Sequence, residues 1–176
     1  MEKPVIRKST VRRIITSSLL LLIILFLLSY FNKGDKSEAT MLIRLEPDNL
    51  SLVSLGELVY QNNCSSCHGS NLEGQENWKE RDIDGYMPAP PHDETGHTWH
   101  HNDEYLFYIT KYGIERFLQL DYPNNMPIYE KSLTDQEILA SLSYIKSKWP
   151  ERIQKMHDEM NQKSLKDKLA GRRFRK

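Results

Sequence analysis

A long apolar run near the N-terminus limits how much of this 176-residue chain can fold in water. Residues 14–31 read IITSSLLLLIILFLLSYF and contain no charged side chain. As an α-helix, this run would rise roughly 27 Å, close to the hydrocarbon thickness of a bilayer. The run therefore predicts an N-terminal transmembrane helix and leaves residues 32–176 beyond it.

The flanking charges indicate how this segment is oriented. Residues 1–13 carry five basic side chains and one acidic side chain, whereas residues 32–39 carry two of each. The positive-inside rule then keeps the N-terminus in the cytoplasm and exports everything after the run. A cleaved signal peptide is the alternative, because Ser37-Glu38-Ala39 loosely resembles a cleavage site. The apolar run exceeds the usual signal core of roughly 7 to 15 residues, which favours the uncleaved anchor.

The formal net charge of zero conceals an acidic central segment between two basic ends. Residues 32–150 contain 10 basic and 19 acidic side chains, whereas residues 151–176 contain nine basic and four acidic ones. Nothing in this distribution indicates nucleic-acid binding. An acidic module suits electrostatic docking of a basic protein partner, although a solvated surface without a partner has the same composition.

Three segments of the exported part have helical patterns with recognisable ends. Apolar residues over 50–60 predict a helix capped by Asp48 or Asn49. A second helix is expected from Asn102 to Gly113, and a third follows the capping box at residues 134–137 and ends before Pro150.

The remaining segments complete the predicted organisation. Residues 1–31 form the basic start and anchor, residues 32–47 a tether with a short extended piece at 41–45, and residues 48–150 the folded domain. Residues 151–176 are rich in Lys, Arg and Gln with sparse apolar positions, which indicates a solvated helix ending in a frayed basic tail. Between residues 69 and 98, glycine, proline and polar residues dominate, so something other than side chains must fill the core there.

The pattern C-x-x-C-H occurs at Cys64-Ser65-Ser66-Cys67-His68, and these are the only two cysteines of the chain. This is the attachment pattern of c-type haem, in which each thiol forms a thioether with one vinyl group and the adjacent imidazole reaches the iron. The alternative to haem attachment is that the two cysteines form a structural disulfide or half of a zinc site. A complete zinc site would need two more ligands at suitable spacing.

With these motifs, residues 48–149 resemble the monohaem class I cytochromes c in their bacterial membrane-anchored form. Gly56 and Tyr60 stand eight and four residues before Cys64, where the family has a helix that crosses the last helix closely, and Tyr144 is the counterpart on that last helix. The resemblance implies an all-α fold of three to four helices around one covalent haem c. It also implies a haem domain in the periplasm, held by a single-pass anchor in the inner membrane.

The resemblance further implies two axial ligands to the iron. His68 is the proximal ligand, and the carbonyl of Pro90 or Pro91 accepts its Nδ1 hydrogen. The distal ligand is expected to be Met126, which lies far downstream of His68 and is followed by Pro127. Met87-Pro88 is a second Met-Pro pair, but it lies much closer to His68 along the chain, which favours Met126. A histidine or an open distal position is the remaining alternative.

The function that the resemblance implies is single-electron transfer between respiratory or periplasmic redox partners, with no enzyme activity of its own. One alternative is an electron-entry subunit of a larger oxidase or oxidoreductase. Another is a haem-based ligand sensor or a peroxidase-like protein, which would require an open or labile distal position. The sequence names neither the donor nor the acceptor.

Two further groups of residues have a functional and an ordinary interpretation. The histidines at positions 92, 97, 100 and 101 lie among carboxylates, which allows a copper or zinc site at His92–His101 as the less favoured hypothesis. A polar loop leading into a capped helix is the ordinary interpretation. Aromatic residues expected to surround the haem are Trp78, Trp99, Tyr112 and Tyr129.

Overall fold

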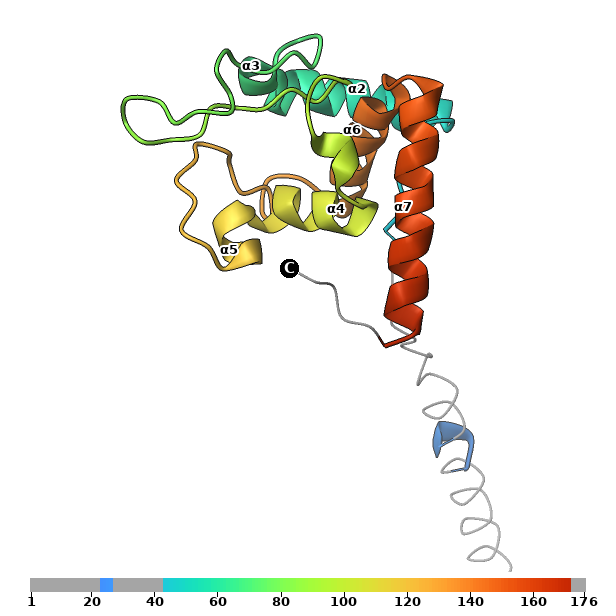
Figure 1. The fold of residues 1–176 in the computed structure, drawn as a ribbon. Helices are drawn as coiled ribbons and strands as arrows, with labels where there is room; N and C mark the ends of the chain where they lie inside the picture. The colour runs from blue at the N-terminus through green and yellow to red at the C-terminus, as the bar shows by residue number, and fades with distance from the viewer. Residues whose placement is uncertain (1–22, 27–42, 172–176) are drawn as a thin grey trace, which may run out of the picture. The chain divides into compact units, whose positions relative to one another are not determined.

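The structure is a computed structural model that describes residues 23–26 and 43–171. The described part of the folded domain is helical and contains no β-strand, which confirms the all-α prediction (Figure 1). The α-helices are α2 (Leu50–Asn63), α3 (Ser65–His68), α4 (Asp103–Tyr112), α5 (Ile114–Leu118), α6 (Asp135–Ser147) and α7 (Glu151–Leu169). A 3₁₀ turn, η1 (Thr98–His100), precedes α4.

Most of the predicted membrane segment at 14–31 lies outside the described residues. Residues 23–26 are helical and form part of a separate unit from the domain that begins at Ile43. Among the residues that the structure describes, no helix is both long and apolar enough to cross a bilayer. The expected anchor therefore stays a prediction.

The helix ends follow the predicted capping residues. The Asn49 side chain accepts a hydrogen bond from the Leu52 amide at the start of α2, and the Asn102 side chain does the same for Tyr105 in α4. Thr134 and Glu137 form a complete capping box at the start of α6. Each cap satisfies amides that have no partner within the helix, so the local sequence determines where these helices begin.

The centre of the domain is the crossing of α2 and α6. A Cβ atom at Gly56 would lie 1.9 Å from the carbonyl oxygen of Ala140, so the two backbones meet at a distance that only glycine permits. The rings of Tyr60 and Tyr144 pack beside this contact with centroids 5.5 Å apart. The pairing of Gly56 and Tyr60 with Tyr144 that the sequence predicted is confirmed.

Helix α7 differs from the predicted solvated helix, because its inner face is packed against the domain. Ile153 is 2% exposed and His157 is fully buried. The His157 Nε2 atom lies 2.9 Å from the carbonyl oxygen of His101, which follows η1. Polar residues make much of this contact, so the segment has few apolar residues at helical spacing. The sequence pattern therefore did not predict that α7 packs against the domain.

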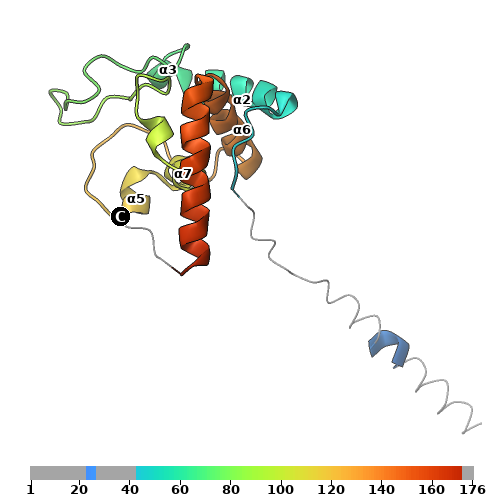
Figure 2. The same cartoon turned by 45° about the vertical axis from the view of Figure 1, so that its right-hand side comes forward.

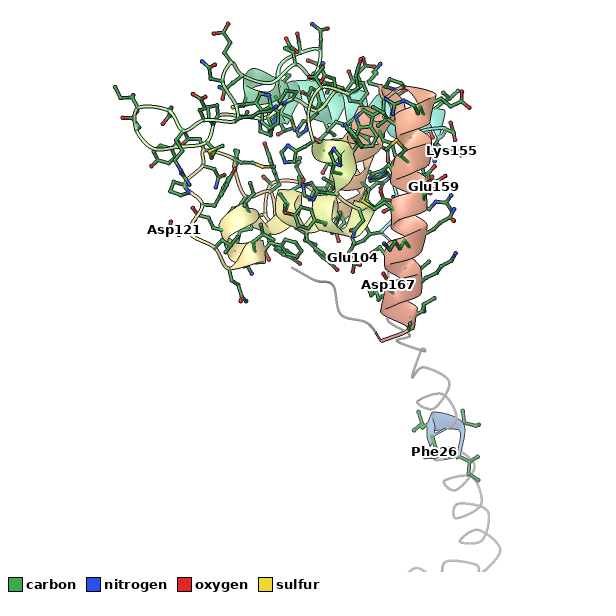
Figure 3. All side chains as sticks on the ribbon, in the orientation of Figure 1. Phe26, Glu104, Asp121, Lys155, Glu159 and Asp167 are labelled. Carbon is green, nitrogen blue, oxygen red and sulfur yellow. The ribbon has the colours of Figure 1, made fainter. Side chains whose placement is uncertain are left out.

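The outer face of α7 matches the solvated prediction. Lys155 and Glu159 are exposed and point away from the domain (Figure 3). On the inner side, Asn161 pairs with Asp103, the first residue of α4, through side chain and backbone hydrogen bonds of 2.9 and 2.8 Å. The predicted frayed tail falls mainly on residues 172–176, which lie outside the described residues.

The predicted boundary between tether and domain at residue 47 is wrong. Leu45 is 2% exposed and belongs to the core cluster of the domain. Its amide donates a 3.0 Å hydrogen bond to Oδ2 of the buried Asp103. The apolar side chain and this buried carboxylate together draw residues 43–46 into the domain, which therefore begins at Ile43.

Residues 69–97 form a long irregular loop that extends away from the helices (Figures 1 and 2). Its base is held by Leu72, which is buried with a positive φ of 70° and whose carbonyl accepts the amides of His92 and Asp93. Gly74 approaches the backbone of Pro91 so closely that a Cβ would lie 2.4 Å from its nitrogen. These contacts bring residues 90–93 next to the chain that follows His68.

Candidate haem site

The C-x-x-C-H segment lies where α2 gives way to the short helix α3, and two buried tyrosines bracket it. The Tyr129 hydroxyl donates a 2.7 Å hydrogen bond to the carbonyl of Asn63, just before Cys64. The Tyr60 hydroxyl donates a 2.7 Å hydrogen bond to the carbonyl of Gly69, just after His68. Both ends of the turn are thus fixed by side chains from the helical core and its flanking segment.

Both cysteines are free thiols, so the structure does not support the disulfide alternative. Cys64 is half-buried against the core and Cys67 is exposed. Burial raises the pKa of the Cys64 thiol to about 11, which keeps it in the neutral thiol form. No cluster of three or more metal-ligating His, Cys, Asp or Glu side chains occurs in the described ranges 23–26 and 43–171, which also leaves a zinc site without support there.

His68 is 7% exposed, and its Nδ1 atom lies 2.9 Å from the carbonyl oxygen of Pro90. Burial lowers the pKa of His68 below its ordinary value, although the hydrogen bond to Pro90 partly offsets the shift. A neutral ring that donates from Nδ1 leaves the lone pair of Nε2 available. Of the two candidate prolines, Pro90 contacts the ring, whereas the Pro91 carbonyl lies 3.4 Å from the Thr98 hydroxyl.

The chemistry of this donor set fits a c-type haem. Two thiols three positions apart precede an imidazole whose Nε2 has no hydrogen-bond partner among the described residues, and a backbone carbonyl fixes the opposite nitrogen. Imidazoles that bind a metal through one nitrogen typically donate from the other nitrogen to a carbonyl, as Nδ1 of His68 does here. The turn can therefore form two thioethers and present one nitrogen ligand.

The two Met-Pro pairs lie on neighbouring segments. The Met87 amide donates a 3.1 Å hydrogen bond to the Pro123 carbonyl, and Met87 forms an isolated parallel bridge with Asn124. Asn124 in turn accepts a 3.0 Å hydrogen bond from the Met126 amide through its side chain. The loop thus already reaches the Met126 segment at Met87, so distance along the sequence from His68 does not by itself separate the two methionines.

Contact with the core distinguishes the methionines better than sequence distance does. Both side chains are half-buried, but Met126 packs against the hydrophobic core cluster and Met87 lies on the loop outside that cluster. A side chain held by the core has fewer alternative positions than one on a long loop. This difference favours Met126 as the thioether donor.

The histidines of the His92–His101 segment lie against other rings, and within the described residues they form no group of three metal-ligating side chains. His97 stacks on Trp78, His100 on Trp99 and His101 on Tyr105, with centroid distances of 5.4, 3.7 and 4.3 Å. In the part of the chain that the structure describes, no copper or zinc site forms at these residues. Burial lowers the pKa of His92, His97 and His101, so these imidazoles are neutral at pH 7.

The four aromatic residues expected around the haem occupy different environments. Trp78 and Trp99 pair with the histidines just described, and Tyr112 stacks on Tyr108 within α4. Tyr129 is 6% exposed and is directly bonded to the start of the C-x-x-C-H turn. Of the four, Tyr129 has the contact that bears on the site.

Comparison with known proteins identifies the family. A family model described as cytochrome c matches residues 53–149, which is more than half of the chain and runs from within α2 to the end of α6. The chain belongs to the cytochrome c family. No curated protein and no solved structure gave a match.

Membership confirms the resemblance to the class I c-type cytochromes and the covalently attached haem c that it implied. The protein is therefore a haem-based electron-transfer protein. Helix α7 lies beyond the matched residues and packs on η1 and α4.

Several residues that shape the site had no distinct signal in the sequence. His92 lies against the ring of His68 with centroids 4.0 Å apart, and the Trp149 indole donates a 2.7 Å hydrogen bond to the His92 carbonyl. Trp149 ends the matched region, and its ring meets His157 of α7 edge-on with centroids 5.0 Å apart. The contacts of His92 join segments that are distant in the sequence, which local periodicity cannot reveal.

Proposed function

We propose that this cytochrome c is a membrane-anchored carrier of single electrons whose haem iron is bound by His68 and Met126. The observation that carries the proposal is the fixed C-x-x-C-H turn with its neutral, Pro90-bonded imidazole. Haem iron held by a histidine and a methionine supplies a one-electron couple with a raised reduction potential. Such an iron has no free coordination position for a substrate.

The residues of the turn have separate tasks in this proposal. Cys64 and Cys67 would hold the haem covalently, each through a thioether bond to one of its two vinyl groups. The Tyr129 and Tyr60 hydroxyls hold the two ends of the turn, so the thiols and the imidazole keep a constant mutual position. Pro90 keeps the proton of His68 on Nδ1 and so directs Nε2 to the metal.

Met126 provides the distal thioether from the segment that leads into α6. Its amide is held by the Asn124 side chain, and its side chain packs against the core. Met87 is the competing donor because its loop is bonded to residues 123 and 124. The contact of Met126 with the core favours it as the ligand.

The charge of the domain supports a basic redox partner. Residues 32–150 carry nine more acidic than basic side chains, and the exposed loop contributes Asp82, Asp84 and Glu80 to this excess. Long-range attraction of this kind accelerates encounter at low ionic strength. The donor and acceptor are expected among proteins on the outer side of the bacterial inner membrane.

Carbon monoxide binding to the wild-type ferrous protein tests the carrier function. We expect one haem mass to be retained on the denatured chain, a low-spin ferrous spectrum, and no spectral change on adding carbon monoxide. Release of the haem by acid extraction would refute covalent attachment. Ready binding of carbon monoxide would favour a ligand sensor or a peroxidase-like protein, because it requires an open distal position.

The anchor needs a separate measurement. We expect N-terminal sequencing of protein extracted from membranes to find residues that precede Ile14. A chain that starts near Thr40 and is recovered in the soluble fraction would contradict the anchor and show removal of a signal peptide. Stoichiometric copurification with a catalytic subunit would identify an electron-entry subunit in place of a free carrier.

A further inference from the structure

The ring of His92 lies face to face with the ring of His68. Their centroids are 4.0 Å apart and their planes differ by 21°. His92 stands two residues after Pro90, whose carbonyl bonds the Nδ1 atom of His68. The same short segment therefore contacts His68 at one ring nitrogen and over one ring face.

His92 is fixed by its own contacts and does not depend on His68 for its position. Its amide donates a 2.7 Å hydrogen bond to the Leu72 carbonyl, and its carbonyl accepts a 2.7 Å bond from the Trp149 indole. Leu72 and Trp149 are buried at 2% and 3% exposure. The backbone of His92 is thus held between the base of the loop and the end of α6.

The ring of His92 is fixed as well. Its Nδ1 atom lies 2.7 Å from the Thr98 hydroxyl, which in turn donates to the Pro91 carbonyl at 3.4 Å. The Thr98 hydroxyl thus connects the His92 ring to the backbone of Pro91. Thr98 is 5% exposed, so water does not compete strongly for these bonds.

From this geometry we propose that His92 is a positioning residue that sets the plane of the His68 ring. The inference rests on the proposed binding of iron by His68. The hydrogen bond to Pro90 holds the Nδ1 atom of His68, but donors occupy a broad range of positions around a carbonyl oxygen. This contact alone therefore leaves the plane of the imidazole ring some freedom to turn. A fixed ring packed against one face removes that freedom, since close-packed interiors resist displacement.

The His100 ring provides a matched comparison on the same segment. It stacks on Trp99 with centroids 3.7 Å apart but is exposed and belongs to a pair that does not include His68. Removing either imidazole takes one stacked histidine from the cluster. Only the loss of His92 should alter the orientation of the proximal ligand.

Paramagnetic NMR of the ferric holoprotein tests the proposal, because the spread of the four haem methyl shifts reports the plane of the axial imidazole. We expect His92→Ala to change this spread and to shift the midpoint potential. His92→Phe retains a ring against His68 and should restore most of the wild-type pattern. Thr98→Val should give a smaller change in the direction of His92→Ala, and His100→Ala should give none.

The outcomes separate this inference from the proposed function. A wild-type protein without a low-spin, covalently attached haem would overturn both. A normal wild-type spectrum with the same methyl spread in His92→Ala would overturn the positioning role alone, as would an equal change in His100→Ala. If His92→Ala does not fold, an unchanged spread in Thr98→Val overturns the role, and a changed spread supports it.

Discussion

The crossing of α2 and α6 and the loop at 69–97 are held in opposite ways. The helices meet through continuous burial around Gly56 and the packed, mutually tilted rings of Tyr60 and Tyr144. The loop has few buried apolar side chains, and Leu72 is its main contribution to the core. It is held by individual hydrogen bonds to backbone groups and by stacked rings.

The helix pair and the loop therefore have different roles in the domain. The helix pair supplies most of the stability and presents the C-x-x-C-H turn at one end of α2. The loop contributes little burial but supplies Pro90 and His92, the groups that contact the proximal imidazole. Changes in the helix pair should therefore affect folding, and changes in the loop should affect the ligand environment.

The largest effect is expected from Gly56→Ala. The new Cβ would lie 1.9 Å from the Ala140 carbonyl oxygen, so α2 and α6 must separate. Overpacking of this kind costs roughly 3 kcal/mol or more of the free energy of unfolding, despite the better helix propensity of alanine. Urea denaturation of the holoprotein followed by circular dichroism measures the loss.

The loop offers a matched glycine for this test. Gly85 has a φ of +84° and open space around its Cβ position, so Gly85→Ala should cost about 1–2 kcal/mol from backbone strain alone. Equal losses in the two variants would contradict the claim that the helix crossing carries most of the stability.

A moderate effect is expected from Tyr129→Phe. The change removes the donor to the Asn63 carbonyl and should cost about 1–2 kcal/mol of the free energy of unfolding, while the haem stays attached. Tyr86, which lies on the exposed loop, is the control, and Tyr86→Phe should stay within about 0.5 kcal/mol of the wild type. Loss of covalent haem in Tyr129→Phe would show that the hydroxyl has a larger role in attachment than the structure indicates.

A smaller effect concerns acid. Burial, with His97 and His100 nearby as the second cause, lowers the pKa of His101 to about 4. Below pH 6.5 the unfolded chain binds a proton at His101 that the native ring does not bind. The neutral ring therefore costs no stability above pH 6.5, and the free energy of unfolding decreases as the pH falls from 6.5 toward 4. One histidine accounts for at most about 1.4 kcal/mol per pH unit, and partial solvent exposure reduces this.

The His101→Phe variant isolates this contribution because phenylalanine can keep the stacking on Tyr105. We expect the free energy of unfolding to fall less between pH 7 and pH 5 in the variant than in the wild type. Identical pH dependence in the two proteins would show that His101 does not contribute to acid sensitivity.

The same contrast shows how far sequence reasoning reaches. Asn49, Asn102 and the Thr134 capping box act locally, and each predicted helix begins where its cap stands. The C-x-x-C-H motif and its family were readable because that chemistry requires residues in one short segment. Local rules were sufficient where the contacts are local.

The errors arose where contacts connect distant segments. The buried Asp103 draws in Leu45 from one side and Asn161 from the other, so the domain begins earlier and α7 is less solvated than predicted. Neither contact changes the periodicity of its own segment. The stacking of His92 on His68 was missed for the same reason, because the spacing of the four histidines does not show which rings they contact.

The central claim, that Met126 completes a saturated electron-carrying haem, is tested most directly by redox titration of Met126→Ala beside Met87→Ala. Loss of a thioether ligand should lower the midpoint potential and let carbon monoxide bind the ferrous haem, with the covalent attachment retained. Met87→Ala should leave both properties as in the wild type. An unchanged potential without carbon monoxide binding in Met126→Ala, or the loss of the ligand in Met87→Ala, would contradict the account.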